Sequence, residues 1–311
     1  MSVIPRDSVD AAEAAFGRHP GSRALHAKGT LCRGTFKATA EAKSLTTAAH
    51  MQGEPVPATF RFSNASGHPD SPDFAPDLRG LAVKFYLPDG SRTDLVSVTA
   101  PVFATRTPEV FVELLKAQGA GAAALVKMPA LLGRHPWLLT RLVKDLPVMR
   151  PAASYVLLRY YAQHAFRWVG ADGAERFVRY TVVPGAGEEP YLRLRDARRR
   201  GRDYLQEELR RRLAAGPVRF TLEVQIAEPG DPVDDASREW PASRQRLTVG
   251  TFELTGPDTE REQGGDVLVF DPTRVTPGIE LSDDAVLHFR SPAYRESVAR
   301  RSGTGTESPQ S

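Results

Sequence analysis

The order of strand-like and helix-like segments is the feature of this sequence that most restricts its fold. Segments typical of half-buried strands occupy the first third of the chain and return in its second half. A block of apolar, helix-like segments separates them, and one more helix-like segment follows the last strands. This order favours an antiparallel α+β protein, because a parallel sheet needs a crossover between successive strands. No Gly-x-Gly-x-x-Gly pattern follows a predicted strand, so a dinucleotide-binding fold has no support.

The predicted strands are rich in branched and aromatic residues and end at turn formers. Residues 171–173 (Ala-Asp-Gly) are typical of a short hairpin loop. A closed antiparallel barrel with inserted helices would protect the sheet edges and could offer an apolar pocket. The strands are expected at 59–64, 80–87, 94–99, 166–170, 175–183, 220–227 and 246–254.

Prolines divide the helical block. Pro108 is typical of the first position of a helix, and Glu109 follows in its first turn. Breaks are expected at Pro129, Pro136, Pro147 and Pro151. The last helix is expected to begin near Pro292, which would put Arg290 at or before its N-cap. The expected helices cover 108–118, 203–213 and about 292–301.

Composition excludes several classes of protein. The 311 residues include 41% hydrophobic and 25% charged residues, as in ordinary globular proteins, and the single cysteine, Cys32, allows no internal disulfide. No apolar run reaches the roughly 18 residues of a membrane-spanning helix. Residues 1–17 lack the apolar core of a secretion signal, so we expect a cytoplasmic protein with no membrane partner. The arginine-rich run 195–202 is short and lacks aromatic residues, so we expect no nucleic-acid partner.

Spacing alone identifies no catalytic or metal site, because the seven histidines form no HxH or HExxH pair. Three segments, however, resemble haem catalases in the same order. They are 23–36, which contains Arg-Ala-Leu-His-Ala-Lys-Gly; 61–63 followed by 77–86 (Asp-Leu-Arg-Gly-Leu-Ala-Val-Lys-Phe-Tyr); and 270–282 followed by 290–294 (Arg-Ser-Pro-Ala-Tyr). Full-length catalases carry a further helical region, and this chain stops soon after the third segment. It is therefore similar to the short catalase-related peroxidase branch.

The resemblance implies one haem-binding domain over residues 1–311. Its expected fold is a closed antiparallel β-barrel of about eight strands with inserted and C-terminal helices. Residues 1–17 are expected to form an N-terminal arm, and residues 302–311 a disordered tail. The implied cofactor is haem, expected to be of the b type. A homodimer or homotetramer is expected because catalase relatives associate.

On the proximal side, the resemblance assigns Tyr294 as the phenolate ligand of the haem iron. Arg290, four residues earlier, could hydrogen-bond that phenolate from the same helical face. Arg301 lies seven residues after Tyr294, which is two helical turns and about 10 Å. The resemblance gives Arg23, Arg61 and Arg301 the role of binding the haem propionates.

On the distal side, the resemblance assigns His26 as the acid/base that moves a proton between the two peroxide oxygens. Ser63 matches the residue that orients this imidazole, and Phe111 matches an aromatic that stacks on the distal haem face. Val98 occupies a position where catalases carry an asparagine that helps hold peroxide. Valine offers no hydrogen bond, so we expect oxidation of a second peroxide to be impaired.

The sequence thus predicts a haem-dependent peroxidase that reduces hydrogen peroxide or organic peroxides with small organic electron donors, with weak catalase activity. Two alternatives stay open. A lipid hydroperoxide isomerase or lyase could use the same ligand set, and the apolar Val98 and Phe103 would suit a fatty substrate. A haem store or a barrel for another small ligand would be non-catalytic, but a carrier does not need a distal base such as His26.

Overall fold

The strands form one antiparallel sheet in the computed structural model, which describes residues 4–188, 191–258 and 268–302. The strands are β1 (Gly29–Ala38), β2 (Val56–Asn64), β3 (Arg79–Tyr86), β4 (Arg92–Val98), β5 (Tyr160–Tyr161), β6 (Phe166–Val169), β7 (Glu175–Pro184), β8 (Val218–Ile226), β9 (Arg246–Pro257) and β10 (Ile279–Leu281).

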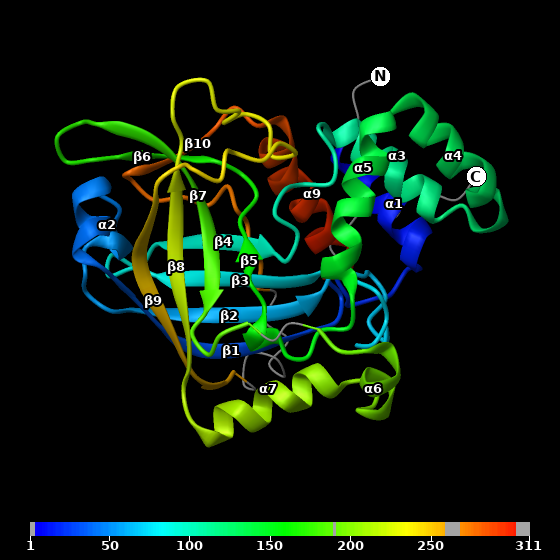
Figure 1. The fold of residues 1–311 in the computed structure, drawn as a ribbon, viewed down its shortest axis with the longest axis horizontal. Helices are drawn as coiled ribbons and strands as arrows, with labels where there is room; N and C mark the ends of the chain where they lie inside the picture. Colours follow the sequence, from blue (N-terminus) through cyan, green and yellow to red (C-terminus); the bar gives the residue numbers. More distant parts are fainter. Residues whose placement is uncertain (1–3, 189–190, 259–267, 303–311) are drawn as a thin grey trace.

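Eight of the described strands close into a barrel (Figure 1). Their order around the ring is β7-β5-β4-β3-β2-β1-β9-β8, and pairing of β8 with β7 completes it. β6 and β10 extend the sheet from β7 outside the ring. The predicted barrel of about eight strands is therefore confirmed. β1 was not among the predicted strands, although it pairs along nearly its whole length with β2 and β9.

Aromatic side chains fill the interior of the barrel. Successive residues of a strand point to opposite faces, so one set from each strand faces inward. Phe36, Phe60, Phe85 and Phe252 are all almost fully buried and pack with ring centroids 4.9 to 6.1 Å apart. Gly250 leaves room for this cluster, because a Cβ there would lie 2.3 Å from the Phe36 ring. Side chains therefore fill the interior of the barrel, so a ligand-binding site is expected on its outer face.

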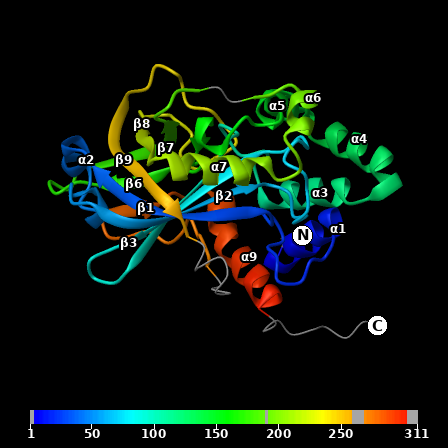
Figure 2. The same ribbon diagram turned by 90° about the horizontal axis from the view of Figure 1, so that it is seen from below.

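The longest helices group at one end of the barrel or lie along it (Figure 2). α1, α3 and α9 contact one another. Residues 5–16 of the expected N-terminal arm form α1, whose Ala11 and Ala12 are buried against α3. Residues 303–311 of the expected tail lie outside the described residues. The helices are α1 (Pro5–Phe16), α2 (Ala40–Leu45), α3 (Pro108–Gln118), α4 (Ala124–Arg134), α5 (Pro136–Asp145), α6 (Leu194–Arg199), α7 (Tyr204–Ala215) and α9 (Ala285–Arg301), with 3-10 turns η1 (Ala49–Met51), η2 (Gly121–Ala123), η3 (Leu146–Met149) and η4 (Tyr155–Leu157).

Two proline-based predictions were wrong. α9 begins at Ala285, well before Pro292, because the Asp284 carboxylate accepts hydrogen bonds from the backbone N–H groups of the first turn. Arg290 therefore lies inside the helix rather than at its cap. Pro129 likewise lies inside α4 and does not end it. The breaks at Pro136, which begins α5, and at Pro147 are confirmed.

A buried histidine inside the barrel makes stability depend on pH. His50 is 3% exposed, stacks on Phe85 at 4.8 Å, and its Nδ1 has no hydrogen-bond partner among the described residues. Burial lowers the pKa of His50 to about 3. Between this value and the ordinary pKa near 6.5, the unfolded chain binds a proton that the folded protein does not. The free energy of unfolding therefore falls as the pH falls through this range.

We predict that His50→Leu weakens this acid sensitivity by up to about 1.4 kcal/mol per pH unit below pH 6.5. Urea denaturation at pH 7 and pH 5 measures it. His68→Leu, at an exposed histidine, is the control. An unchanged difference between the two pH values in His50→Leu would contradict the prediction.

Candidate active site

The outer face of strands β1 to β4 forms a shallow platform. Gly29, Ser63, Gly80 and Val98 lie directly opposite one another across the four strands. Their strand neighbours Phe62 and Leu81 belong to the barrel core, so these four residues face outward. Two glycines in one row leave space above the sheet. Two positions along each strand, on the same outer face, the next row consists of Leu31, Arg61, Ala82 and Val96.

His26 is held over this platform in a strained conformation. Its φ of 56° is the one positive φ of a non-glycine residue in the described part of the chain. Its N–H donates to the Ala65 carbonyl at 3.0 Å, and its carbonyl accepts from Arg61 Nη2 at 2.9 Å. Nδ1 of the ring lies 3.0 Å from Ser63 Oγ. His26 is thus held at its backbone by Ala65 and Arg61 and at its ring by Ser63, the contact that the sequence analysis expected.

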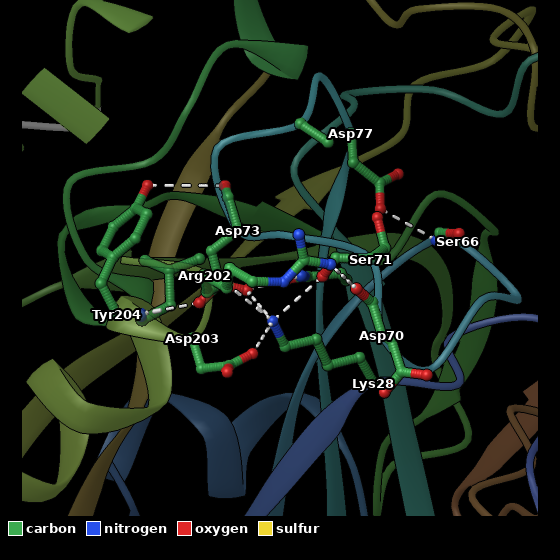
Figure 3. A network of polar contacts seen from close by, with 12 residues as sticks. Lys28, Ser66, Asp70, Ser71, Asp73, Asp77, Arg202, Asp203 and Tyr204 are labelled. Carbon is green, nitrogen blue, oxygen red and sulfur yellow. Dashed lines mark hydrogen bonds and ion pairs between the residues drawn. The ribbon is translucent and has the colours of Figure 1, made fainter. Parts of the chain in front are cut away.

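The loop that holds the His26 backbone is itself fixed by a polar network around the buried Lys28 and Asp73 (Figure 3). Lys28 Nζ forms ion pairs with Asp73 at 2.8 Å and with Asp203 at 2.6 Å. The Ser66 N–H donates to Asp77, while the Ser66 carbonyl accepts from the residue after His26. These contacts tie residues 65–77 to the start of α7. A rigid support of this kind can maintain the strained φ of His26.

Positive charges keep the His26 ring neutral. Burial and the charges of Arg61, Arg290 and Arg23 lower the pKa of His26 to about 3. At neutral pH the imidazole therefore carries a free lone pair and can accept a proton. This is the protonation state that a general base requires.

Tyr294 lies at the end of a series of hydrogen bonds that begins at the buried Asp284 and His164 and passes through the half-buried Arg290. Arg290 donates to the phenol oxygen of Tyr294 from Nε at 2.9 Å and from Nη2 at 2.6 Å. Nη1 of Arg290 lies 3.0 Å from Nε2 of His164. Nδ1 of His164 lies 2.8 Å from the Asp284 carboxylate. The predicted contact between Arg290 and Tyr294 is therefore present, from inside the helix.

The guanidinium of Arg290 decides which atom donates and which accepts in each hydrogen bond of this series. A guanidinium only donates, so Nε2 of His164 accepts and its Nδ1–H donates to Asp284. Burial lowers the pKa of His164, which favours this neutral form. Burial raises the pKa of Asp284. The hydrogen bond from His164 and the N–H groups of α9 together lower this pKa by more than burial raises it, so the net shift is downward. The phenol oxygen of Tyr294 is thus held by two N–H groups of a guanidinium that His164 and Asp284 fix in place.

Sequence reasoning did not single out His164 or Asp284. Asp284 precedes α9 and caps it, which is the ordinary role of an aspartate at that position. His164 is 120 positions away in sequence. The one available signal was the placement of an aspartate and an arginine before Tyr294 on one helix.

Three arginines meet at the edge of the platform. Arg23 and Arg301 both donate to the Leu268 carbonyl. Burial, and then the charges of Arg61 and Arg301, lower the pKa of Arg23 to about 8, and Tyr294 opposes this shift. Such a cluster is suited to a ligand with two negative charges, because each carboxylate would offset the mutual repulsion.

Apolar side chains border the same space. Leu268 and Phe270 pack with Leu31, Ala82 and Val96 on the outer face of the barrel. The ring of Phe111, on α3, lies 5.3 Å from that of Phe103, which is 6.1 Å from His164. Val98 sits opposite Gly80, beside the His26 ring. Apolar side chains and a cluster of arginines therefore border the platform, a lining that suits an apolar ligand with acidic groups.

The segment that carries His26 packs on the helix that carries Tyr294. The Ala24 N–H donates to Ser297 Oγ of α9 at 3.5 Å, and Arg23 and Arg301 both donate to the Leu268 carbonyl. The phenol oxygen of Tyr294 accepts from Arg290 on the same helix. His26 and Tyr294 therefore lie on adjacent segments of the protein.

Comparisons with known proteins agree on one family. A family model described as "Catalase" matches residues 14–308. A catalase-related peroxidase of Mycolicibacterium paratuberculosis is 51% identical, over 99% of this chain and 98% of the relative. Another, of Synechococcus elongatus, is 32% identical, over 96% and 89%. Catalase A of Saccharomyces cerevisiae has the same fold, with a TM-score of 0.77 and 22% identity over 91% of this chain and 62% of that structure.

We predict that Gly80→Ala disturbs the His26–Ser63 contact. A Cβ at this position would lie 2.7 Å from Ser63 Oγ and 3.0 Å from the His26 ring. Overpacking of this kind lowers the free energy of unfolding by about 1 to 3 kcal/mol. Urea denaturation measures it.

Gly256→Ala is the matched control, because the nearest heavy atom there is 3.7 Å away. Its free energy of unfolding should stay within about 0.5 kcal/mol of the wild type. Equal effects of the two substitutions would contradict the proposed crowding at Gly80.

Proposed function

This chain belongs to the catalase family, and from that premise we propose that it is a haem-dependent peroxidase that reduces hydrogen peroxide or organic peroxides with small organic electron donors. It is an oxidoreductase that acts on peroxide. The observation that supports the proposal is a neutral His26, oriented by Ser63, on a segment that packs against the helix with the Arg290-bound Tyr294. The relatives at 51% and 32% identity bear the name peroxidase, which favours reduction over rearrangement of a hydroperoxide.

The residues fit a haem, which we propose to be of the b type. Tyr294 would bind the iron, and Arg23, Arg61 and Arg301 would bind the two propionates. The lowered pKa of Arg23 supports this, because a dianion would compensate the charges that now repel one another. We propose that Phe111 stacks on the distal face. When bound, the haem iron supplies the oxidation and reduction chemistry that the side chains lack.

His26 has two tasks in the proposed reaction. Its neutral ring would accept a proton from one peroxide oxygen and return it to the other, so that water can leave when the O–O bond breaks. The bound haem would supply the two electrons that this cleavage needs. Ser63 Oγ, 3.0 Å from Nδ1, holds the ring so that Nε2 is the atom that exchanges the proton. The strained φ of 56° keeps the ring over the platform throughout.

On the proximal side, a chain of hydrogen bonds fixes the position of the Tyr294 phenol oxygen. Two N–H groups of Arg290 donate to that oxygen, and His164 and Asp284 prevent the guanidinium from rotating away. The oxygen would thereby be held in place to ligate the iron. Arg290, His164 and Asp284 are in this account positioning residues, because none of them touches the peroxide.

Val98 sets the balance between peroxidase and catalase activity. Its side chain is on the platform beside His26, but it offers no hydrogen bond to a second peroxide. Oxidation of that second peroxide is therefore slow, and a small organic donor supplies the electrons instead. The same apolar residue would suit a fatty hydroperoxide, for which product analysis is the test.

We propose the cytoplasm as the compartment, because Cys32, the single cysteine, is buried and needs no oxidising environment. The proposed partners are peroxide and a small organic reductant. We also propose a homodimer or homotetramer, by analogy with catalase relatives.

Val98→Asn tests the proposed function directly. We predict that the wild-type holoprotein consumes hydrogen peroxide rapidly with an organic donor and releases little oxygen without one. The substitution places an amide beside His26, so oxygen release without donor should rise at least about tenfold, corresponding to about 1.4 kcal/mol of barrier. An oxygen electrode measures it.

Val98→Ala is the control, because it removes side-chain volume without adding a hydrogen bond. Its oxygen release should stay low. Rapid oxygen release by the wild type without a donor would contradict the peroxidase proposal, and a rise of equal size in Val98→Ala would contradict the role of the amide.

A further inference from the structure

The hairpin of α4 and α5 lies away from the barrel, at the opposite end of the molecule from α2 (Figures 1 and 2). Its inner side has a small core of its own. Leu131 of α4 and Leu138 of α5 pack there against Val110 and Leu114 of α3. The hairpin therefore has a fixed position on α3, and its outer side is free of the barrel.

That outer side is unusually apolar. Seven large apolar side chains are exposed in the described residues, and five of them lie in α4, α5 and the following turn η3. Leu139, Val143 and Leu146 are 52 to 60% exposed and spaced at i, i+4 and i+7, which places them on one helical face. The other two are Leu125 and Val126, at the start of α4. Exposed apolar residues gathered in this way mark interaction surfaces.

The charges on the same segment have one sign. Every exposed charged side chain of residues 121–150 is basic, namely Lys127, Arg134, Lys144 and Arg150. The one acidic residue, Asp145, is buried and paired with Arg141. Arg134 contacts Glu113 at 2.7 Å, and Lys144 contacts Glu239 at 3.6 Å. Both are exposed ion pairs, which contribute little to the stability of the fold.

We propose that this outer face of the α4–α5 hairpin docks on the surface of an anionic lipid bilayer. Apolar side chains flanked by lysine and arginine are the pattern by which helices lie in a membrane interface. The helices do not cross it. In the described chain no helix is long and apolar enough to span a membrane, and α4 and α5, of 11 and 10 residues, reach only about 15 Å. The expectation of no membrane partner rested on spanning length and did not address an interfacial contact.

A second copy of the chain is the main competing occupant. A two-fold contact brings the same surface of each copy together, so Lys127 and Lys144 would meet basic residues of the other copy. Like charges oppose such a contact, whereas phosphate headgroups attract them. The proposal does not depend on the peroxidase activity, because lipid binding is measured without turnover.

Vesicle flotation of the full-length holoprotein tests the proposal. The probes are vesicles of phosphatidylglycerol and phosphatidylcholine in equal parts, and vesicles of phosphatidylcholine alone. We expect the wild type to float with the anionic vesicles, and the bound fraction to fall at least fivefold with the neutral ones or when salt is raised from 0.1 to 0.5 M. No flotation, or equal binding to both vesicles, would overturn the proposal.

The matched variants are Leu139→Asp/Val143→Asp on the docking face and Leu194→Asp on α6, where the leucine is 44% exposed. The double variant should lose binding at least fivefold and Leu194→Asp should not, with peroxide turnover and circular dichroism confirming that both fold. Lys127→Glu/Lys144→Glu keeps the apolar face and should also weaken binding. Unchanged flotation of both double variants, or a dimer that Leu139→Asp/Val143→Asp dissociates without any vesicle binding, would overturn the proposal.

Discussion

The two hydrogen bonds from Arg290 to the Tyr294 phenol oxygen are the contact on which the site depends. They exist because one carboxylate does two things. Oδ1 of Asp284 caps α9 and so starts the helix early enough to place Arg290 and Tyr294 one turn apart. Oδ2 of the same residue binds His164, which holds the third nitrogen of the guanidinium. The start of α9 and the position of the Arg290 guanidinium are therefore both set by one buried carboxylate.

On the distal side, the surrounding structure holds His26 in a strained backbone conformation. His26 would not adopt a φ of 56° by itself. The hydrogen bond to Ala65, the bond from Arg61 and the absence of a Cβ at Gly80 together define its place. The barrel supplies two of these three, because Arg61 lies on β2 and Gly80 lies on β3, opposite Ser63. The register of the barrel strands therefore sets the position of the His26 imidazole. That position determines which proton transfers are within hydrogen-bond reach.

Local patterns predicted much of the fold, and family resemblance predicted most of the site. Individual strands followed from the alternation of apolar and polar residues, which is typical of strands with one buried face, whereas the barrel of about eight strands followed from the resemblance. The start of α9 could not be predicted from Pro292, since a proline inside a helix is tolerated when capping and packing favour the longer helix. His164 was missed because contacts between residues 120 positions apart leave no local signal. Gly80 was recognised as part of a strand, but its role depends on the side chains of two other segments.

The central claim is that Tyr294 ligates a haem iron opposite His26, and the visible absorption spectrum of the reconstituted protein tests it most directly. The account predicts ferric charge-transfer bands in the wild type that are lost or shifted in Tyr294→Phe, because phenylalanine has no oxygen to bind the iron. His26→Ala, which leaves the proximal ligand intact, should keep the haem and its phenolate bands. Identical spectra of wild type and Tyr294→Phe, or no Soret band in the wild type after reconstitution with haem, would contradict the account.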